Sequence, residues 1–200
     1  MSKEYDSQMN DKSQTSDDGR SMRERMLAGD LYIADDPQIT VDIHRAAVLM
    51  HRFNTGDPTD NDKLAGTLRE LLGTLGEGAW VRAPFYVDYG SRIHSGARTF
   101  INYGATLLDV APIVIGEDVQ IGPNVQLLTP THPLEAELRR AKWETAKPIT
   151  IGNNVWLGGG VIVCPGVTIG ENTVIGAGAV VTKDLPANVL AVGNPARVIR

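Results

Sequence analysis

The sequence predicts an all-β body, a parallel β-helix, preceded by a small α-helical segment. Two observations predict this arrangement. Through most of residues 78–200 an aliphatic residue recurs every six positions, and in half of these cases glycine follows it. Neither a helix nor an ordinary strand has a period of six, whereas a short strand with a tight turn does, and hexapeptide repeats are typical of β-helices. Before residue 77 the apolar residues recur at helical spacing instead.

Residues 1–21 are expected to form a disordered tail. Ser, Asp, Gln, Lys and Asn dominate this stretch, and almost nothing in it is apolar enough to bury. It has no hydrophobic stretch of the kind found in secretory signals. No apolar run elsewhere in the chain is long enough to span a membrane. We therefore expect a cytoplasmic protein.

Residues 22–77 are expected to be helical. A short helix runs from Met22 and ends at Gly29, because glycine is favoured just beyond helix ends. Apolar residues three and four apart indicate two further helices, the second of which would stop at Gly76. The two stripes consist of Ile43, Ala46, Ala47, Met50 and Phe53, and of Leu64, Leu68, Leu71, Leu72 and Leu75. We expect both to pack against the body rather than to take part in chemistry.

Residues 78–200 are expected to form the β-helix. The aliphatic anchors are Val81, Val87, Ile93, Ile115, Ile121, Leu127, Ile151, Leu157, Val163, Ile169, Ile175 and Val181. Leu127 and Ile151 are 24 residues apart, four times six, so the register continues across an inserted loop at about 130–148. Three short strands would make one coil of a triangular prism, with each anchor stacked on the equivalent anchor one coil above at about 4.8 Å. The glycines are expected to accept turn conformations with positive φ.

A β-sandwich with short strands is the main structural alternative to this fold. It would need turn signals every ~8–12 residues rather than every six, so the spacing of the anchors disfavours it.

Several longer segments resemble one family. They are MLAGDLY, YGSRIHSG, LDVAPIVIG, THP, PITIGNNVWLGGGVIVCPGVTIGENTVIGAGAVVTKDLP and the ending GNPARVIR, and they span about Met22 to Arg200. They resemble the hexapeptide-repeat acyltransferase superfamily, in particular the subfamily of maltose, galactoside and nodulation O-acetyltransferases. The resemblance implies a left-handed β-helix, acetyl-CoA as co-substrate, no required metal and a sugar hydroxyl as acceptor. It also implies a homotrimer with active sites between subunits.

The inserted loop contains the candidate catalytic base, His132, in the sequence TPTHPLEAELRRAKWETAKP. A sugar hydroxyl is a poor nucleophile until a base removes its proton, and an imidazole, with an ordinary pKa of about 6.5, suits that task. Pro133 restricts the backbone of His132 to extended conformations. The resemblance aligns THP with the catalytic histidine of the subfamily; the alternative is a surface histidine. We expect His44, His51 and His94 to lie at the surface.

The resemblance also implies an acceptor-binding wall. Asn102 and Asp109, in FINYGATLLDV, align with it, and Asp109 is a candidate to orient His132. The alternatives are an asparagine at a coil corner for Asn102 and a turn cap for Asp109. Asp35 and Asp36 follow LYIA, where relatives have an acceptor-contacting aspartate, but the spacing does not decide which of the two applies. A helix N-cap is the alternative there.

A CoA site is implied by the resemblance as well. Gly159 and Ala177 align with contacts to the pantetheine arm and are small, as close approach requires. Cations suited to the CoA phosphates stand late in an otherwise acidic chain, at Lys183, Arg197 and Arg200. The alternative for these three is a solubilising basic end. Trp156 is placed near the CoA groove or the trimer interface, with simple packing as the alternative.

No covalent acyl-enzyme is expected. Cys164 occupies a small repeat position and is expected to be buried and inert. Direct transfer would then rely on proximity of the two substrates and on a backbone N–H, near residues 158–160, that stabilises the oxyanion.

Composition and histidine spacing weigh against other functions. The net charge of −5 disfavours nucleic acid as a partner, and one cysteine cannot form an intrachain disulfide. A γ-class carbonic anhydrase would need three histidines at a metal, but the coil region has only His94 and His132, 38 residues apart. A non-catalytic scaffold would leave the THP loop and the basic cluster unexplained. The acceptor stays open between maltose or glucose, a galactoside, a lipochitooligosaccharide and an amine.

Overall fold

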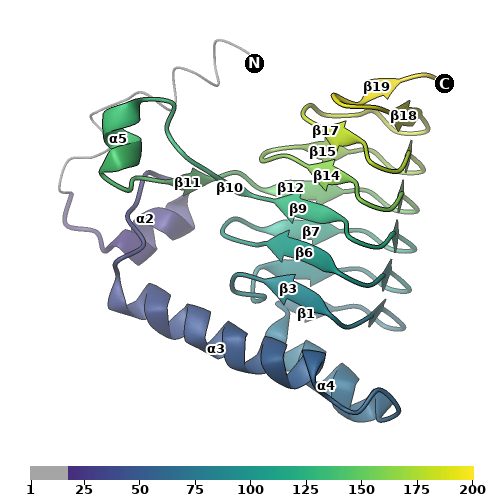
Figure 1. Ribbon diagram of the computed structural model, residues 1–200, viewed down its shortest axis with the longest axis horizontal. Helices are drawn as coiled ribbons and strands as arrows, with labels where there is room; N and C mark the ends of the chain where they lie inside the picture. The colour runs from purple at the N-terminus through teal and green to yellow at the C-terminus, as the bar shows by residue number, and fades with distance from the viewer. Residues whose placement is uncertain (1–17) are drawn as a thin grey trace.

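A triangular prism of stacked coils forms the body of the protein, and helices cover one side and one end of it (Figure 1). The structure, a computed structural model, describes residues 18–200, so most of the tail expected at residues 1–21 lies outside the described residues. The coils wind as a left-handed parallel β-helix, as the sequence predicts. Each coil contributes one short strand to each of three faces.

The three faces are named here by the order in which the chain meets them. The first face contains β1 (Thr74–Leu75), β4 (Ile93–Ser95), β7 (Ile113–Ile115), β12 (Ile149–Ile151) and β15 (Thr168–Ile169). The second face contains β2 (Trp80–Val81), β5 (Phe100–Ile101), β8 (Gln120–Ile121), β13 (Trp156–Leu157), β16 (Val174–Ile175), β18 (Leu190–Val192) and β19 (Arg197–Val198). The third face contains β3 (Phe85–Val87), β6 (Ala105–Leu108), β9 (Gln126–Leu128), β14 (Ile162–Val163) and β17 (Val180–Val181). All pairs are parallel except β18 with β19.

The aliphatic anchors fill the centre of the prism, as the six-residue period predicts. All twelve are buried, and most of them are fully buried. Ile115 pairs directly with Ile151, so the coil register continues across the inserted loop. Apolar side chains stacked in this way remove a continuous column of hydrocarbon from water, which is the main source of stability for the coils.

The positive φ expected of the glycines occurs at several coil glycines, among them Gly160 and Gly178, but not at those directly after the anchors. A Cβ on Gly152 would lie 2.6 Å from the backbone nitrogen of Glu171, and one on Gly116 would lie 2.4 Å from Asn153 Oδ1. These glycines therefore allow adjacent coils to approach closely. The positive φ angles fall two residues later, for example at Asn154 (54°). Asparagine tolerates that region better than most residues.

Three helices precede the prism: α2 (Met22–Ala28), α3 (Pro37–Asn54) and α4 (Asn61–Leu71). Gly29, with a φ of 80°, ends α2 as predicted. The helix expected to continue to Gly76 ends at Leu71, and Leu75 lies in β1. A Cβ on Gly73 would lie 2.4 Å from the carbonyl oxygen of Ser91, so the chain turns onto the first coil where only glycine fits.

Part of the apolar stripe on α3 does not pack against the body. Ala46 and Phe53 are buried, but Ile43 is 40% exposed and Ala47 is exposed as well. These two residues line a pocket beside the inserted loop. The helical period thus identified the helix but assigned one edge of its apolar face to the wrong environment.

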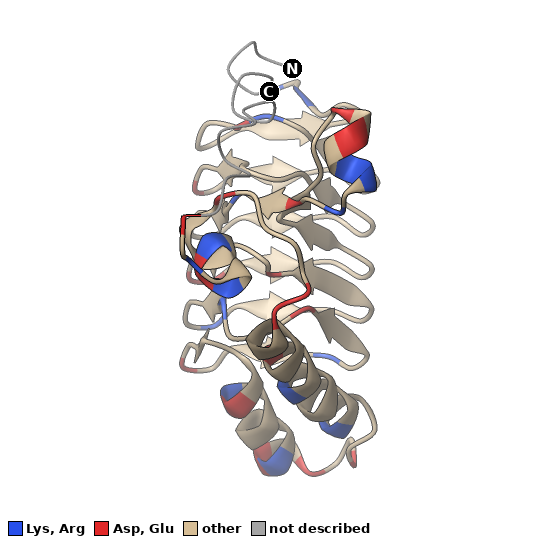
Figure 2. Ribbon diagram, turned by 90° about the vertical axis from the view of Figure 1, so that its left-hand side faces the viewer, with Lys and Arg blue, Asp and Glu red and all other residues tan. Residues whose placement is uncertain are grey.

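The inserted loop leaves the prism between β9 and β12. It contains β10 (Pro130–Thr131), α5 (Ala136–Arg140) and β11 (Thr145–Ala146), and β10 pairs antiparallel with β11. Figure 2 shows the charged residues concentrated on the helices and at the turns of the prism. Within residues 18–200, no helix has the length and apolar character needed to cross a bilayer.

Candidate active site

His132 and Glu144 lie opposite each other at the mouth of the inserted loop. In the β10–β11 ladder Pro130 is the partner of Ala146, and Thr131 is the partner of Thr145. The next pair in this antiparallel register is His132 and Glu144. Their side chains approach to 3.9 Å between Nε2 and Oε2. This distance suits an electrostatic contact with a protonated imidazole better than a hydrogen bond.

A third segment joins this pair. The backbone N–H groups and carbonyls of Tyr32 and Glu144 exchange two hydrogen bonds of 3.0 Å. Burial raises the pKa of Tyr32, and the nearby Glu144 carboxylate, to which the phenol donates a hydrogen bond, adds to the effect. The Glu144 side chain is only 20% exposed, whereas the His132 side chain is 57% exposed. The carboxylate is therefore held in place while the imidazole remains open to a substrate.

Asp88 lines the same pocket as His132, Glu144 and Tyr32. Burial, with the neighbouring carboxylates of Asp109 and Glu144, raises the pKa of Asp88 to about 6. The pocket therefore holds a histidine and two acidic side chains within one small space. Such clusters of perturbed groups in a cleft are typical of functional sites.

Asp109 supports the pocket from behind rather than facing it. Its side chain is fully buried and accepts hydrogen bonds from the backbone N–H groups of Asp88, Tyr89 and Arg92, at 2.8–3.2 Å. Asp109 thus fixes the turn that carries Asp88, and this is the turn-cap role expected as the alternative to acceptor binding. Asp109 is not among the residues that line the pockets containing His132.

The pocket has an apolar side and a charged side. Ile43, Ala47 and Met50 of α3 supply apolar surface, together with Val87 and Val110 of the prism, around a volume of about 360 Å³. A second cavity of about 520 Å³ also includes His132 and Glu144, and Asp35, Arg139 and Lys142 line its outer part. A group bound at His132 would therefore meet hydrocarbon on one side and both signs of charge on the other.

The structure separates the two candidate aspartates that follow LYIA. Asp35 is exposed and lines the outer cavity with His132. Asp36 is the N-cap of α3, because its side chain accepts a hydrogen bond of 2.8 Å from Gln38 N. Hydrogen bonds from the backbone N–H groups of Arg23 and Gln38 lower the pKa of Asp36.

Asn102 lies at a different place from His132. It stands at the corner between the second and third faces, and its Oδ1 accepts a hydrogen bond of 2.9 Å from Tyr103 N. It lines neither cavity that contains His132. Within this chain, therefore, Asn102 and His132 do not face the same space.

Gly159 and Ala177 lie at the same corner, on adjacent coils. Gly178 N donates a hydrogen bond of 2.9 Å to Gly159 O, which brings the two positions together. A Cβ on Gly159 would lie no closer than 3.4 Å to Pro123, an ordinary contact. The fold thus does not require glycine at position 159, and the space that a side chain would fill there is available to a bound molecule.

The remaining candidate residues lie at the surface near the C-terminal end. Lys183, Arg197 and Arg200 are exposed, and Trp156 projects outward from the second face with 55% of its area exposed. Cys164 is half-buried, and burial raises the pKa of its thiol, as expected for an unreactive cysteine. Residues 18–200 contain no group of three or more His, Cys, Asp or Glu side chains placed to hold a metal ion.

Sequence reasoning missed Glu144 and Asp88. Glu144 stands in the part of the loop where the sequence has no repeat, and only its antiparallel pairing reveals that it faces His132. Asp88 follows the anchor Val87 in a segment whose motif, YGSRIHSG, begins one residue later. A polar residue directly after a buried strand residue was the available signal.

Comparison with known proteins agrees with this architecture. Residues 25–76 match the maltose acetyltransferase hexapeptide capping motif, and residues 148–183 match the bacterial transferase hexapeptide family. Nodulation protein L of Rhizobium meliloti is 48% identical over 90% of this chain and 98% of its own.

Two solved structures also align along almost the whole chain. A maltose O-acetyltransferase from Clostridium difficile 630 superposes with a TM-score of 0.90 and 44% identity, over 92% of this chain and 98% of its own. A galactoside acetyltransferase in complex with coenzyme A superposes with a TM-score of 0.88 and 44% identity, over 91% of each chain. The chain therefore belongs to the hexapeptide-repeat acyltransferases, in the subfamily of maltose, galactoside and nodulation O-acetyltransferases, and is an acetyltransferase.

Proposed function

We propose that this acetyltransferase moves the acetyl group of acetyl-CoA to a hydroxyl of a sugar, with His132 as the general base. The observation that carries the proposal is the exposed His132 imidazole facing the held carboxylate of Glu144 in a pocket of mixed polarity. The similar galactoside acetyltransferase was solved with coenzyme A, which supports the choice of donor. The names of the relatives support a sugar as the acceptor.

The reaction would be a direct transfer between two bound substrates. One ring nitrogen of His132 takes the proton of the acceptor hydroxyl as its oxygen attacks the thioester carbonyl. The imidazolium lies beside Glu144, whose negative charge stabilises it. When the tetrahedral intermediate collapses, the C–S bond breaks and the imidazolium returns the proton to the thiolate of CoA. The products are the acetyl ester and free CoA, and His132 is neutral again.

Acceptor hydroxyls have several candidate partners around this base. Asp88 and Asp35 line the two cavities that contain His132, and both can accept hydrogen bonds from sugar hydroxyls. Asp109 would act indirectly by fixing the turn that carries Asp88. Asp36 would act by capping α3, whose Ile43 and Ala47 line the pocket.

Acetyl-CoA would lie along the corner that carries Gly159 and Ala177. The pantetheine arm needs a smooth surface, and the backbone is close to solvent at both positions. Lys183, Arg197 and Arg200 would neutralise the phosphates at the C-terminal end of the prism. A backbone N–H near residues 158–160 is the candidate donor to the oxyanion.

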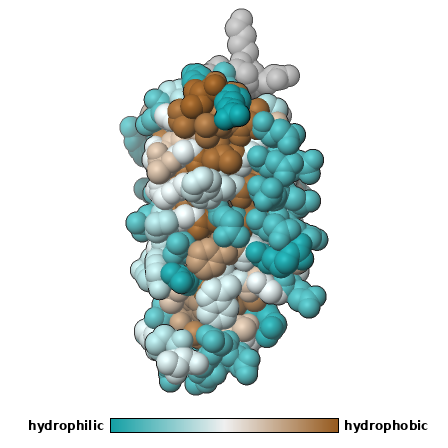
Figure 3. Space-filling model, turned by 90° about the vertical axis from the view of Figure 1, so that its right-hand side faces the viewer, coloured by the Kyte–Doolittle hydropathy of each residue, from teal (hydrophilic) through white to brown (hydrophobic). Residues whose placement is uncertain are grey.

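The site would be completed between subunits of a homotrimer. Asn102 and the CoA corner lie apart from His132 on one subunit, so a single chain does not assemble all the groups assigned to the reaction. Three exposed apolar side chains support contact with another copy of the chain: Trp156, Val198 and Ile199. Figure 3 shows hydrophobic side chains gathered at the end of the prism where the chain finishes. Dilution should therefore lower the specific activity as the trimer dissociates. Light scattering on the same dilution series would measure the oligomeric state. Full activity in a monomer would contradict this assignment.

The test of the function is acetyl-CoA-dependent thiol release by the purified protein. We would measure it with maltose, glucose, a galactoside and a chitooligosaccharide, and with a small amine as a comparison acceptor. Mass spectrometry of the product would identify an ester or an amide. Acceptor-dependent release with a sugar, and formation of an ester, is the expected result. Release with the amine alone would overturn the sugar assignment but leave the acetyl transfer intact.

A further inference from the structure

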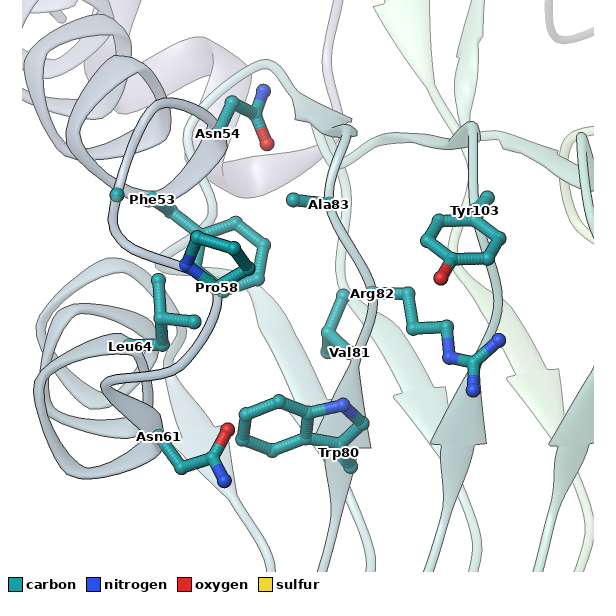
Figure 4. A pocket seen from close by; sticks show the side chains of 11 residues that line it. Phe53, Asn54, Pro58, Asn61, Leu64, Trp80, Val81, Arg82, Ala83 and Tyr103 are labelled. Carbon is teal, nitrogen blue, oxygen red and sulfur yellow. The ribbon is translucent and has the colours of Figure 1, made fainter.

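Another pocket, separate from the two cavities at His132, lies at the opposite end of the molecule from the C-terminus, between the α3–α4 connection and the first coil (Figure 4). It has a volume of about 470 Å³, within the ~300–1,000 Å³ typical of small-molecule sites. Trp80, Arg82 and Tyr103 form the prism side, and Pro58 and Asn61 form the side of the α3–α4 connection. None of these residues lines the cavities around His132.

The walls of this pocket are held in place without a ligand. Asn54 Nδ2 donates a hydrogen bond of 2.9 Å to Phe85 O, and Phe85 N donates one of 2.9 Å back to Asn54 Oδ1. This pair of bonds fixes the end of α3 against the prism. Phe53, Leu64 and Val81 are buried and form an apolar floor. A pocket preformed in this way loses little entropy when it binds.

Hydrogen-bond donors in the pocket lack protein partners. The Arg82 guanidinium lies 4.8 Å from the Tyr103 ring centre and 5.4 Å from that of Phe100. Among residues 18–200 it makes no hydrogen bond or ion pair, so its N–H donors are open to a ligand. The side chain of Asn61 and the hydroxyl of Tyr103 are likewise without a hydrogen-bond partner in this part of the chain. Tyr103 is 50% exposed.

These groups select one class of ligand. No carboxylate lines the pocket, which disfavours a cation, and Arg82 is the only charged residue in it, which disfavours a phosphate chain. A purely apolar ligand would leave the donors unpaired at a cost. A sugar ring matches both features, because its C–H face stacks on aromatic rings and its hydroxyls accept hydrogen bonds.

We propose that this pocket, lined by Trp80, Arg82 and Tyr103, binds a saccharide unit of an oligosaccharide. Tyr103 follows Asn102, the residue assigned to the acceptor wall, so the pocket lies next to that wall on the same corner of the prism. This assignment rests on the proposed function, and it means that the acceptor extends beyond the sugar that is acetylated. The unit in this pocket is one that the enzyme holds but does not modify.

Equilibrium binding to the full-length protein, without an acetyl donor, tests the pocket. The probes are glucose, N-acetylglucosamine and their tetramers, maltotetraose and chitotetraose. One tetramer should bind at least about tenfold more tightly than its monomer, and Arg82→Ala and Tyr103→Ser should each remove about tenfold of that affinity. Arg69→Ala, which removes an exposed arginine of α4 outside the pocket, should bind like the wild type. Equal binding of tetramer and monomer, or unchanged binding by both pocket variants, would overturn the proposal.

Separate measurements distinguish this pocket from the catalytic proposal. If tetramer binding depends on Arg82 but no sugar is acetylated, the pocket stands and the proposed reaction fails. If monosaccharides are acetylated and the tetramer has no advantage, the reaction stands and the pocket fails. Light scattering of Arg82→Ala and Tyr103→Ser tests whether another copy of the chain fills the pocket instead. An unchanged oligomer would exclude that occupant, and loss of the oligomer in both variants would overturn the saccharide assignment.

Discussion

The coils and the inserted loop of this protein obtain their structure in different ways. In the coils, each anchor has equivalents one turn above and below, for example Ile151 between Ile115 and Ile169. The inserted loop has no such equivalents: single contacts define its form, among them one two-residue ladder, the backbone hydrogen bonds of Glu144 with Tyr32 and the hydrogen bond from Thr145 Oγ1 to Gly29 O. Repetition makes the coils stable and predictable, whereas the candidate base His132 and its partner Glu144 stand where the repetition stops. Substitutions of residues packed between coils should therefore change stability, and substitutions of His132 and Glu144 should change activity.

The largest expected effect is loss of activity in His132→Ala. General bases contribute about 10²–10⁴-fold to rate, and kcat should fall by about that factor. Because the His132 side chain is 57% exposed, the midpoint of thermal unfolding should change little. The measurement is thiol release under saturating acetyl-CoA, with His44→Ala, an exposed histidine on α3, as the matched control. Residual activity near that of the control would remove His132 from the mechanism.

Substitution of two coil glycines, Gly152 and Gly159, tests whether close packing between coils determines stability. Gly152→Ala would place a Cβ 2.6 Å from the backbone nitrogen of the next coil, and should lower the free energy of unfolding by about 1–3 kcal/mol. Gly159→Ala meets only an ordinary contact with Pro123 and should unfold like the wild type. If the pantetheine arm lies over Gly159, this second variant should instead raise the KM for acetyl-CoA.

Urea unfolding and acetyl-CoA titration of both glycine variants would check these expectations. A Gly159→Ala protein with unchanged stability and unchanged KM would move CoA away from this corner. A Gly152→Ala protein as stable as the wild type would mean that adjacent coils can separate locally without loss, contrary to the close packing described here.

The sequence predicts the coils well because a repeated local rule produces them. An anchor every six residues is enough to assign twelve core positions and the register across the insertion. It could not reveal why glycine follows the anchors, because the close approach of Gly152 to Glu171 joins residues on different coils. The end of α4 at Leu71 was missed for the same reason: the clash that demands Gly73 comes from Ser91, far along the chain.

The site was only partly predictable because its geometry depends on pairings that leave no periodic trace. His132 became the candidate base through its motif and its place in a polar insertion. The contact with Glu144 follows from an antiparallel ladder of two residue pairs, too short to recognise in sequence. The sequence assigned Asp109 and Asp36 to acceptor binding, with capping as the alternative, and the structure directs both carboxylates to backbone N–H groups.

A smaller loss of activity is expected for Glu144→Gln. The variant keeps the shape of the side chain but removes the charge 3.9 Å from the imidazole, so the imidazolium formed during transfer loses its stabilising partner. We expect kcat to fall about tenfold, with the KM for acetyl-CoA unchanged. If the Glu144 carboxylate acts only by accepting the hydrogen bond of the Tyr32 phenol, the variant should lose thermal stability while kcat stays the same. Steady-state kinetics and a thermal melt on one preparation separate the two roles.

The smallest effect is a gain of stability in Asp88→Asn above pH 6. The pKa of Asp88 is raised to about 6 in the folded protein, from 3.8. Below pH 3.8 the carboxyl is neutral in both the folded and the unfolded chain, so it causes no penalty. As the pH rises from 3.8 to about 6, the unfolded chain ionises this carboxyl while burial near Asp109 and Glu144 keeps it protonated in the folded protein, so stability is lost across this window and stays lower above pH 6. Asparagine avoids that loss, by about 1 kcal/mol after allowance for solvent screening.

Thermal melts of Asp88→Asn and the wild type between pH 4 and pH 8 would measure this gain. The two proteins should differ little at pH 4, diverge between pH 4 and pH 6 and keep a constant difference above about pH 6, with the variant the more stable. Activity at pH 8 should move in the opposite direction, because Asp88 lines the pocket of His132 and its charge is assigned to the acceptor. Gain of stability with loss of activity at one residue would show that this part of the molecule is arranged for binding at the expense of its own folding, unlike the coils.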